Sequence, residues 1–418
     1  MNKKYFLFVL IFSVASLNSQ THRQTGALTL QEAVALALKE NPEIRAAQKE
    51  VAAAEGGILQ AGKIPNPEFG ITWNEISSLN LGSAGERDIG ISQEIEYPSK
   101  RSFRIQNAQL EKSITELRVE RMKKRVAVRV KQAYFSALLA KTVLANLLEQ
   151  KKMLEDLERV ITDRFTSQAG NYVDVLRMKV EIARLNNDRT EAEREVKRKL
   201  NELNLAVGAP GETVYDIGDT LSYHELPLNR DSLIAEMLSQ SISLRIAEKE
   251  KAYRQNILSA SGANYLPDFK ISLAQQRRVE SGGYNNGLWG IEVNVSVPLW
   301  FWQEPKGIEQ DASARLDVAV IQQESVERKI RIAVNNAVDA VEAVQSQIAV
   351  FNSSLLRDSE DIFATVISQY RNNQTDLVTL FDVYRTYRAS KNEYTRTIAN
   401  YFLAVTELEA AANDIEPE

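Results

Sequence analysis

The side chains that could do chemistry in this 418-residue chain are charged ones, 56 acidic and 51 basic, because cysteine is absent and histidine occurs only at His22 and His224. A thiol nucleophile, a thiolate metal site and a disulfide framework therefore cannot form. Two distant histidines do not make a catalytic triad or a histidine-rich metal cluster, and no glycine-rich phosphate loop is present. We expect no enzymatic activity, no cofactor and no metal site.

The chain is mildly acidic, with a net charge of −5, so a nucleic-acid partner is not expected. Its first residues combine Lys3 and Lys4 with an apolar run over 5–14 and small or polar residues over 15–19. This pattern is typical of a secretory signal peptide, residues 1–20, whose apolar run is too short to span a membrane. We expect an exported protein without a transmembrane helix and without a lipid on cysteine.

The elements that position these charges repeat along the chain at an offset of 200 residues. The matching positions are Gly62, Pro67, Phe69, Ile71 and Pro98 in the first half, and Gly262, Pro267, Phe269, Ile271 and Pro298 in the second. Self-similarity at a fixed offset predicts equivalent structural units. We therefore expect a first unit over residues 28–208, a linker over 209–229 and a second unit over 230–412.

Each unit is expected to contain a helix, a β-hairpin, a long helix and a shorter helix. In the first unit, the proline and glycine positions predict a helix 30–61 capped by Thr29, strands 68–76 and 87–97, a long helix 99–165 capped by Ser99, and a helix 172–206. In the second unit they predict a helix 230–261, strands 268–276 and 288–297, a long helix 305–370 and a last helix 376–412.

The predicted strands alternate between apolar and polar residues. Their apolar faces include Ile89, Ile91 and Ile95 in the first unit, and Trp289, Ile291, Val293 and Val295 in the second. Such strands are typical of a membrane β-barrel; the alternative is a soluble hairpin with one buried face. Four strands cannot close a barrel, and open edges are not tolerated in lipid, so a barrel requires several chains. Two chains give a barrel filled by side chains, whereas three give twelve strands and a lumen.

The long helix over 99–165 would measure about 100 Å, and the two shorter helices of its unit, stacked end to end, would match it. Apolar residues recur every seven positions along both long helices, as expected for packed helical seams. These residues are Val119, Val126, Ala133, Ala140, Leu147, Leu154 and Ile161, then Val334, Val341, Ile348, Leu355 and Ile362. The pattern suits a tube wall, and it also suits an exported coiled-coil scaffold or adhesin without a pore.

Several aromatic residues lie in the predicted strands or just after them, namely Trp73, Tyr97, Trp289, Trp300 and Trp302. They fit an aromatic girdle at a membrane surface. The segment Trp300-Phe301-Trp302 could instead form core beneath the barrel.

The chain resembles the TolC-like outer-membrane efflux protein family over about 28–412. The resemblance rests on Leu28-Thr29-Leu30-Gln31-Glu32-Ala33 with Asn41-Pro42, on Pro65-Asn66-Pro67-Glu68, and on the doubled plan of hairpin and helices. It implies a homotrimer in the outer membrane of a Gram-negative bacterium, with a twelve-stranded barrel continuous with a long periplasmic α-helical tunnel. The implied function is passive export from periplasm to exterior. The implied partners are outer-membrane lipid, a periplasmic adaptor and an inner-membrane pump of the proton-driven RND type.

Within this family, the segment 92–101, Ser-Gln-Glu-Ile-Glu-Tyr-Pro-Ser-Lys-Arg, resembles the branch that exports heavy-metal cations of the cobalt-zinc-cadmium type. That branch often has glycine where this chain has Ser99. The resemblance implies heavy-metal cations as the cargo, although metal-binding histidine and cysteine clusters are absent.

Two turns between long and short helices complete the pattern. Glycine and asparagine favour turns, and an acid in a first helical turn favours the helix dipole, which is sufficient to explain Asp174 and Asp376. The resemblance adds a periplasmic gate, in which Tyr370 matches a gate tyrosine, Asp174 its acidic partner and Asp382 an aspartate of a ring around the lumen. The positions of a second ring aspartate and of a gate arginine hold Thr379 and Thr375. The implied adaptor-docking tips are Gly170, Asn171, Asn372, Asn373 and Gln374.

Overall fold

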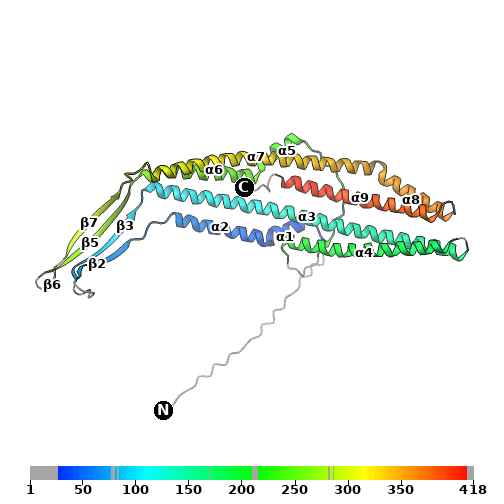
Figure 1. Ribbon diagram of the computed structural model, residues 1–418, viewed down its shortest axis with the longest axis horizontal. Helices are drawn as coiled ribbons and strands as arrows, with labels where there is room; N and C mark the ends of the chain where they lie inside the picture. Colours follow the sequence, from blue (N-terminus) through cyan, green and yellow to red (C-terminus); the bar gives the residue numbers. More distant parts are fainter. Residues whose placement is uncertain are drawn as a thin grey trace, which may run out of the picture.

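The structure is a computed structural model that describes residues 27–76, 81, 84–168, 170–209, 215–280, 283–285 and 287–411. The expected signal peptide and His22 lie outside the described residues. The molecule is elongated, with its strands at one end and, at the other, the two turns that connect consecutive helices (Figure 1). It is mostly helical with a small antiparallel sheet, which agrees with the expected combination of long helices and hairpins.

The first half of the chain contributes a short strand β1, two helices, a hairpin and two further helices, in the order β1 (Ala27–Leu28), α1 (Leu30–Glu40), α2 (Pro42–Ala61), β2 (Glu68–Ile76), β3 (Ala84–Ile95), α3 (Pro98–Thr166) and α4 (Tyr172–Val207). The second half contributes β4 (Asp216–Ile217), α5 (Arg230–Gln240), α6 (Ile242–Ser261), the 3₁₀ turn η2 (Gly262–Tyr265), β5 (Asp268–Glu280), β6 (Gly283–Tyr284), β7 (Leu288–Ser296), α7 (Glu304–Val350), the π-helical turn η3 (Phe351–Leu355), α8 (Leu356–Arg371) and α9 (Leu377–Ala410).

The first helix of each half is broken, so the single helices expected over 30–61 and 230–261 are wrong. Asn41 and Ser241 have extended backbones and act as the C-cap of one helix and the N-cap of the next. The Asn41 side chain accepts a hydrogen bond from the Glu43 N–H at 2.9 Å, and Ser241 accepts one from Leu244 at 3.1 Å. Side-chain caps of this kind satisfy amides that a new helix leaves free. The two breaks lie 200 residues apart.

The start of α3 also differs from expectation. Its N-cap is Tyr97, without a side-chain cap, and Pro98 occupies the first helical position. Proline lacks an N–H and is preorganised for this position, so a serine cap is not needed. Ser99 lies inside the helix, and its buried hydroxyl has no hydrogen-bond partner within the described part of the chain. The prediction that Ser99 caps this helix is therefore wrong.

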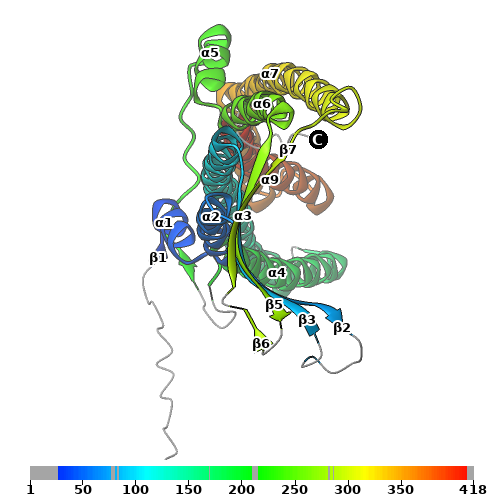
Figure 2. The same cartoon turned by 90° about the vertical axis from the view of Figure 1, so that its left-hand side faces the viewer.

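The helices form a curved wall. Along the half nearest the sheet, α2, α3, α6 and α7 contact one another in that order, and farther away α4 and α9 flank α3. Figure 2, viewed from the strand end, shows this row of helices behind the sheet. The short helices α2 and α4 follow successive parts of α3, as expected (Figure 1). Of the expected α3 seam residues, all are buried except Ala133, which is half-buried.

The expected second long helix is interrupted at η3. Upstream, Val334, Val341 and Ile348 are buried as expected, but Leu355 and Ile362 are exposed. The buried residues beyond η3 are Ser359, Phe363, Val366 and Tyr370. A π-turn inserts one extra residue and so rotates the following helix relative to the preceding one. The predicted heptad frame is therefore correct for α7 and wrong by one residue for α8.

The four main strands form one antiparallel sheet in the order β2-β3-β5-β7, with β6 paired to β5. The register places residues of like character in rows across the sheet. Three rows on the apolar face are Ile95-Phe269-Val295, Phe69-Ile91-Leu273-Ile291 and Ile71-Ile89-Gln275-Trp289. Two rows on the opposite face are Glu68-Ser92-Ser272-Glu292 and Gly70-Gly90-Ala274-Gly290. The predicted alternation is confirmed, although β3 begins earlier and ends before Tyr97.

Candidate functional site

The two turns at the helical end share one backbone geometry. Ser167 and Asn372 are the C-caps of α3 and α8, and the next residues, Gln168 and Asn373, have positive φ angles of 60° and 62°. The α4 N-cap, Asn171, accepts a hydrogen bond from Val173 N at 3.0 Å. Equivalent residues of the two turns are separated by 205 positions. A non-glycine residue with positive φ is uncommon and typically marks a defined turn.

The second turn is capped by Asp376, whose carboxylate accepts a hydrogen bond from Thr379 N at 2.7 Å. Hydrogen bonding from Thr379 lowers the pKa of Asp376, because amide donors stabilise the charged carboxylate. Thr379, expected at the position of a ring aspartate, is exposed on the first turn of α9. Asp376 therefore caps the N-terminus of α9.

Gly170 lies where a side chain has little room. A Cβ at this position would lie 3.0 Å from the Phe165 backbone nitrogen and 3.1 Å from the Arg164 carbonyl carbon. Both are backbone atoms, which cannot move aside without shifting the turn. The close approach of the chain to the end of α3 therefore favours glycine.

Tyr370 is the most enclosed of the expected gate residues, with 4% of its surface exposed. The Arg164 guanidinium lies over its ring, 4.7 Å from the centroid, and donates a 2.8 Å hydrogen bond to the Tyr370 carbonyl. Arg164 also contacts the Asn373 side chain. The end of α3 is thereby tied to the turn after α8.

The expected pairing of Tyr370 with Asp174 is not seen as a hydrogen bond among the described residues. Burial raises the pKa of the Tyr370 hydroxyl, Arg164 opposes this change, and the nearby Asp174 carboxylate contributes to it. Asp174 is half-buried in the first turn of α4, and Asp382 is exposed on α9. Asp174 and Tyr370 are therefore neighbours, whereas Asp382 lies on the surface of the single chain.

The expected adaptor-docking residues lie at the two turns. Asn171, Asn372, Asn373 and Gln374 are exposed, and Gly170 is half-buried. Nearby on α4, Val173, Leu176 and Val180 form an exposed apolar stripe. The helical spacing of the stripe places all three side chains on one face.

Sequence reasoning missed Arg164 and the ion pairs behind the turns. Arg385 donates a 2.9 Å hydrogen bond to Glu181, which is buried, and Arg388 pairs with Asp188. Each pair joins α9 to α4. For Arg164 a signal existed, because a basic residue in a last helical turn interacts favourably with free carbonyls.

The sheet exposes its apolar face in the single chain. All residues of β7 are exposed, and Ile291 reaches 77%. Beyond β7, Trp300, Phe301 and Trp302 are also exposed, so they do not form core within one chain. Large apolar patches of this kind mark an interaction with lipid or protein.

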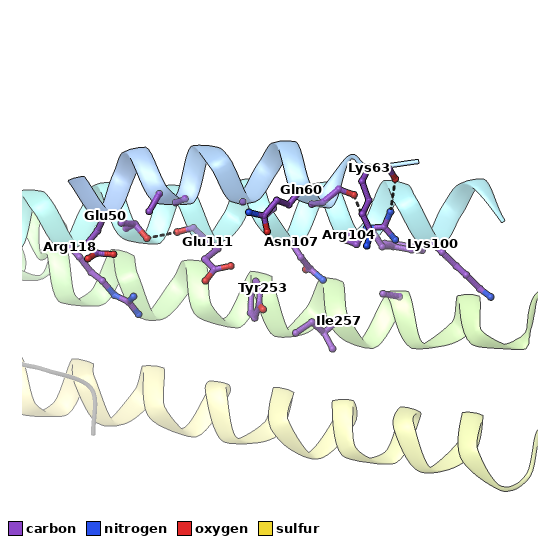
Figure 3. Close-up of a pocket in the computed structure, with 18 of the residues that line it drawn as sticks. Glu50, Gln60, Lys63, Lys100, Arg104, Asn107, Glu111, Arg118, Tyr253 and Ile257 are labelled. Atoms are coloured by element: carbon purple, nitrogen blue, oxygen red, sulfur yellow. Dashed lines mark hydrogen bonds between the residues drawn. The ribbon is translucent and has the colours of Figure 1, made fainter. Parts of the chain in front are cut away.

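A groove of about 1600 Å³ lies between α2, α3 and α6 next to the sheet. Figure 3 shows Glu50 and Gln60 of α2, Arg104 and Glu111 of α3, and Tyr253 of α6 around it. The groove is polar, and many of its charges are compensated. Along α3 the charged side chains of the lining are mainly basic, and Glu111 is the acid among them. The basic residues are Lys100, Arg104, Arg118, Arg121 and Arg125.

The groove is continuous with the polar face of the sheet. Lys100, on the groove wall, donates a 2.7 Å hydrogen bond to Asp268, the first residue of β5 on the polar face. Arg104 donates two 2.7 Å hydrogen bonds to Glu96 and one of 2.6 Å to the Ala61 carbonyl. These contacts join the ends of α2 and α3 to the base of the sheet.

Neither a metal cluster nor a membrane-spanning helix is found in the described part of the chain. Across the described residues, no set of three or more histidine or acidic side chains is arranged to hold a metal ion. Within that same part of the chain, every helix is too short or too polar to cross a membrane.

Comparisons with known proteins agree with this arrangement. Residues 33–209 match the family model of outer membrane efflux proteins. The cobalt-zinc-cadmium resistance protein CzcC of Cupriavidus metallidurans is 22% identical over 387 residues, covering 92% of this chain and 90% of CzcC.

Solved structures share the fold at low identity. CusC, described in connection with transmembrane channel formation, has a TM-score of 0.76 at 15% identity, with 92% of each chain covered. The open-state outer membrane channel MtrE of Neisseria gonorrhoeae has a TM-score of 0.75 at 18% identity, covering 92% of this chain and 88% of MtrE. Over residues 33–209 the chain matches the outer membrane efflux protein family, and over most of its length it shares the fold of the solved outer membrane channels, in agreement with its sequence resemblance.

Proposed function

We propose that this protein is the outer-membrane channel of a tripartite efflux system, a passive duct from periplasm to exterior. The observation that carries the proposal is the sheet, which combines a continuous apolar face with a polar face on strands joined directly to a wall of long helices. A lipid-facing surface and a water-facing surface on the same strands are what a membrane pore requires.

The single chain is an incomplete pore. Among the described strands, β2 and β7 each pair on one side only, so the sheet has two open edges. Unpaired backbone groups are very costly in lipid. In a homotrimer, β7 of one chain pairs with β2 of the next, and twelve strands close around a lumen. The two halves of each chain, related by the 200-residue offset, then act as equivalent parts of the wall.

In this assembly the polar face of the sheet and the groove of Figure 3 face the water-filled path. The Lys100–Asp268 contact carries the polar surface from strands to helices. The duct passes cargo over a surface of mixed charge, on which no strong binding is needed. Energy comes from partners: an adaptor that docks at the turns around Gly170 and Asn372, and an inner-membrane pump of the proton-driven RND type.

Heavy-metal cations are the cargo that the sequence relatives favour, because the relative CzcC is named for resistance to cobalt, zinc and cadmium. A duct requires no metal cluster for this cargo. Deletion of the gene in its own bacterium should lower the tolerated concentration of at least one of these cations, and restoring the gene should recover it. Unchanged tolerance to all three, with increased sensitivity to organic compounds, would reject the cargo and retain the channel.

The channel itself is tested by the native mass of the mature chain extracted by detergent from the outer-membrane fraction. A mass of three chains, with ion conductance in planar bilayers, is expected. A monomer in the soluble fraction would reject the channel. That result would favour the alternative, an exported helical scaffold or adhesin without a pore.

A further inference from the structure

Two arginines lie side by side on the apolar face of the sheet. Arg87 of β3 is directly opposite Arg277 of β5, and Trp73 of β2 completes the same row. Side chains alternate between the two faces along each strand, and all three of these lie on the same face as Ile89 and Ile91, which is the apolar face. Like charges directly opposite each other destabilise an antiparallel pair. Their placement therefore sets two positive charges side by side on that face.

The row of arginines lies at the end of the apolar band that is farther from the helices. The band extends from Val297 to Trp289, about 26 Å along the strand direction, which is comparable with the apolar height of a membrane barrel. Trp300, Phe301 and Trp302 follow the near end. The arginines lie in the next row of the same face beyond Trp289, the end of the band farther from the helices. This is the level where lipid headgroups begin.

Two acids near the arginine row lie on different faces of the sheet. Glu86 accepts a hydrogen bond from Gln276 and pairs with Arg278 at 3.5 Å. All three of these residues lie on the polar face of the sheet. The side chain of Glu75 lies over Gly85, one step farther out on the arginine face.

The state of Arg277 differs from that of Arg278. Arg277 is half-buried, its Nε is buried without a hydrogen-bond partner in the described residues, and among those residues it forms no salt bridge. Arg278, the next residue, has the Glu86 carboxylate beside it. One of two adjacent arginines is thus compensated within the sheet, and the other retains donors for a ligand.

We propose that Arg87 and Arg277 bind the phosphate group of an outer-leaflet lipid, with Trp73 beside its acyl chains. This inference rests on the proposed channel, because it requires the apolar face to meet lipid. Guanidinium groups bind phosphate by paired hydrogen bonds, and an aromatic ring at the interface suits the boundary between headgroup and chain. The apolar band next to the arginines selects a lipid phosphate over a free one.

The test uses the full mature protein, purified as the trimer and titrated with diphosphorylated lipid A or with the same lipid after removal of its phosphates. Bound lipid is counted by native mass spectrometry. Wild-type protein should bind the phosphorylated form selectively. Arg277→Gln should weaken that binding roughly tenfold, because a hydrogen bond to a charged group is lost, and Arg277→Lys should lie between the two. Arg278→Gln, a change on the polar face, is the matched control and should bind as wild type.

Equal binding of the two lipid forms, or wild-type affinity in Arg277→Gln, would overturn the site. If inorganic phosphate displaces lipid A at similar concentration, the ligand is free phosphate and the lipid assignment is wrong. If the Arg87→Gln, Arg277→Gln double variant fails to assemble, the lipid binding of the single variants still tests the site. A trimer that conducts without phosphate-dependent lipid binding defeats this inference alone, whereas absence of a trimer also defeats the proposed channel.

Discussion

The Arg164 guanidinium stacks on the ring of Tyr370, 4.7 Å from its centroid, and donates a hydrogen bond to the carbonyl of the same residue at 2.8 Å. One side chain thereby holds the end of α3 against the turn that follows α8. The gate arginine expected from the family falls on Thr375 in this chain. Arg164 supplies a cationic contact to Tyr370, the expected gate tyrosine, from the other helical hairpin.

Replacing Arg164 by alanine should loosen the contact between the end of α3 and the turn that follows α8. Loss of the cation–π contact and of the charged hydrogen bond should cost about 2 kcal/mol. In the proposed channel the expected result is a larger resting conductance in planar bilayers. Cells that carry the variant should also become sensitive to a large antibiotic normally excluded by the outer membrane.

Arg159→Ala is the matched control, since Arg159 lies on the same helix and its ion pair, with Asp156, stays within α3. It should conduct as wild type. Tyr370→Phe keeps the ring under Arg164 but removes the hydroxyl. An effect as large as that of Arg164→Ala would show that the hydroxyl, rather than the stacked ring, holds the turn.

Asp382 offers a separate test of the aperture. Its carboxylate is exposed on α9, and threefold symmetry in the proposed trimer would place three copies around the path, where they attract cations. Asp382→Ala should weaken block of the current by multivalent cations added to the periplasmic side. Asp361→Ala, an exposed acid on α8, should not. Equal block in both variants and wild type would remove Asp382 from the aperture.

Gly170 should tolerate no side chain. In Gly170→Ala the added Cβ meets backbone atoms of Phe165 and Arg164 at 3.0 and 3.1 Å, so the turn must shift, at a cost of roughly 1–3 kcal/mol. Weaker binding of the adaptor by the purified channel is expected, measured by surface plasmon resonance.

Gly262→Ala provides the comparison, because a Cβ at Gly262 would have no heavy atom within 4 Å. Its adaptor binding and thermal stability should remain at wild-type values. Normal adaptor binding by Gly170→Ala would argue against docking at this turn.

Much of the fold could be predicted from the sequence because its signals are local. Alternation in β3 and β7 determines which face is apolar, and proline and glycine positions mark the strand ends. The breaks at Asn41 and Ser241 were missed. Asn41 precedes a proline, which disfavours helical backbone, but serine at 241 can cap a helix or remain inside one. Packing against other elements decides which of these two positions Ser241 takes.

The one-residue insertion at η3 could not be predicted because the heptad continues on both sides of it in the sequence, through Leu355 and Ile362. In the folded chain, tertiary packing buries Phe363 instead of Ile362. Phe363 stacks on Tyr387, with ring centroids 5.2 Å apart, and the Tyr394 hydroxyl donates to Asn352 within the π-turn at 3.1 Å. Aromatic contacts of this kind outweigh the regular spacing, and they also bring Tyr370 to the buried side.

Tyr384 should make the helical end sensitive to alkaline pH. Burial raises the pKa of this residue to about 12, and its enclosed hydroxyl has no hydrogen-bond partner among the described residues. An unfolded tyrosine loses its proton near pH 10. The native state binds that proton more tightly, so the stability is complete below about pH 10 and falls as pH rises toward 12, by about 3 kcal/mol in all.

Tyr384→Phe should remove this loss and leave stability at neutral pH unchanged or slightly higher, because no hydrogen bond is broken. Thermal unfolding followed by circular dichroism at pH 8 and at about pH 11 measures both effects, since the larger pH lies between the two pKa values. Tyr172→Phe, with its ring exposed at the first turn, should retain the alkaline loss of the wild type. If Tyr384→Phe were instead destabilised at pH 8, the hydroxyl would have a partner, and the alkaline loss would have another origin.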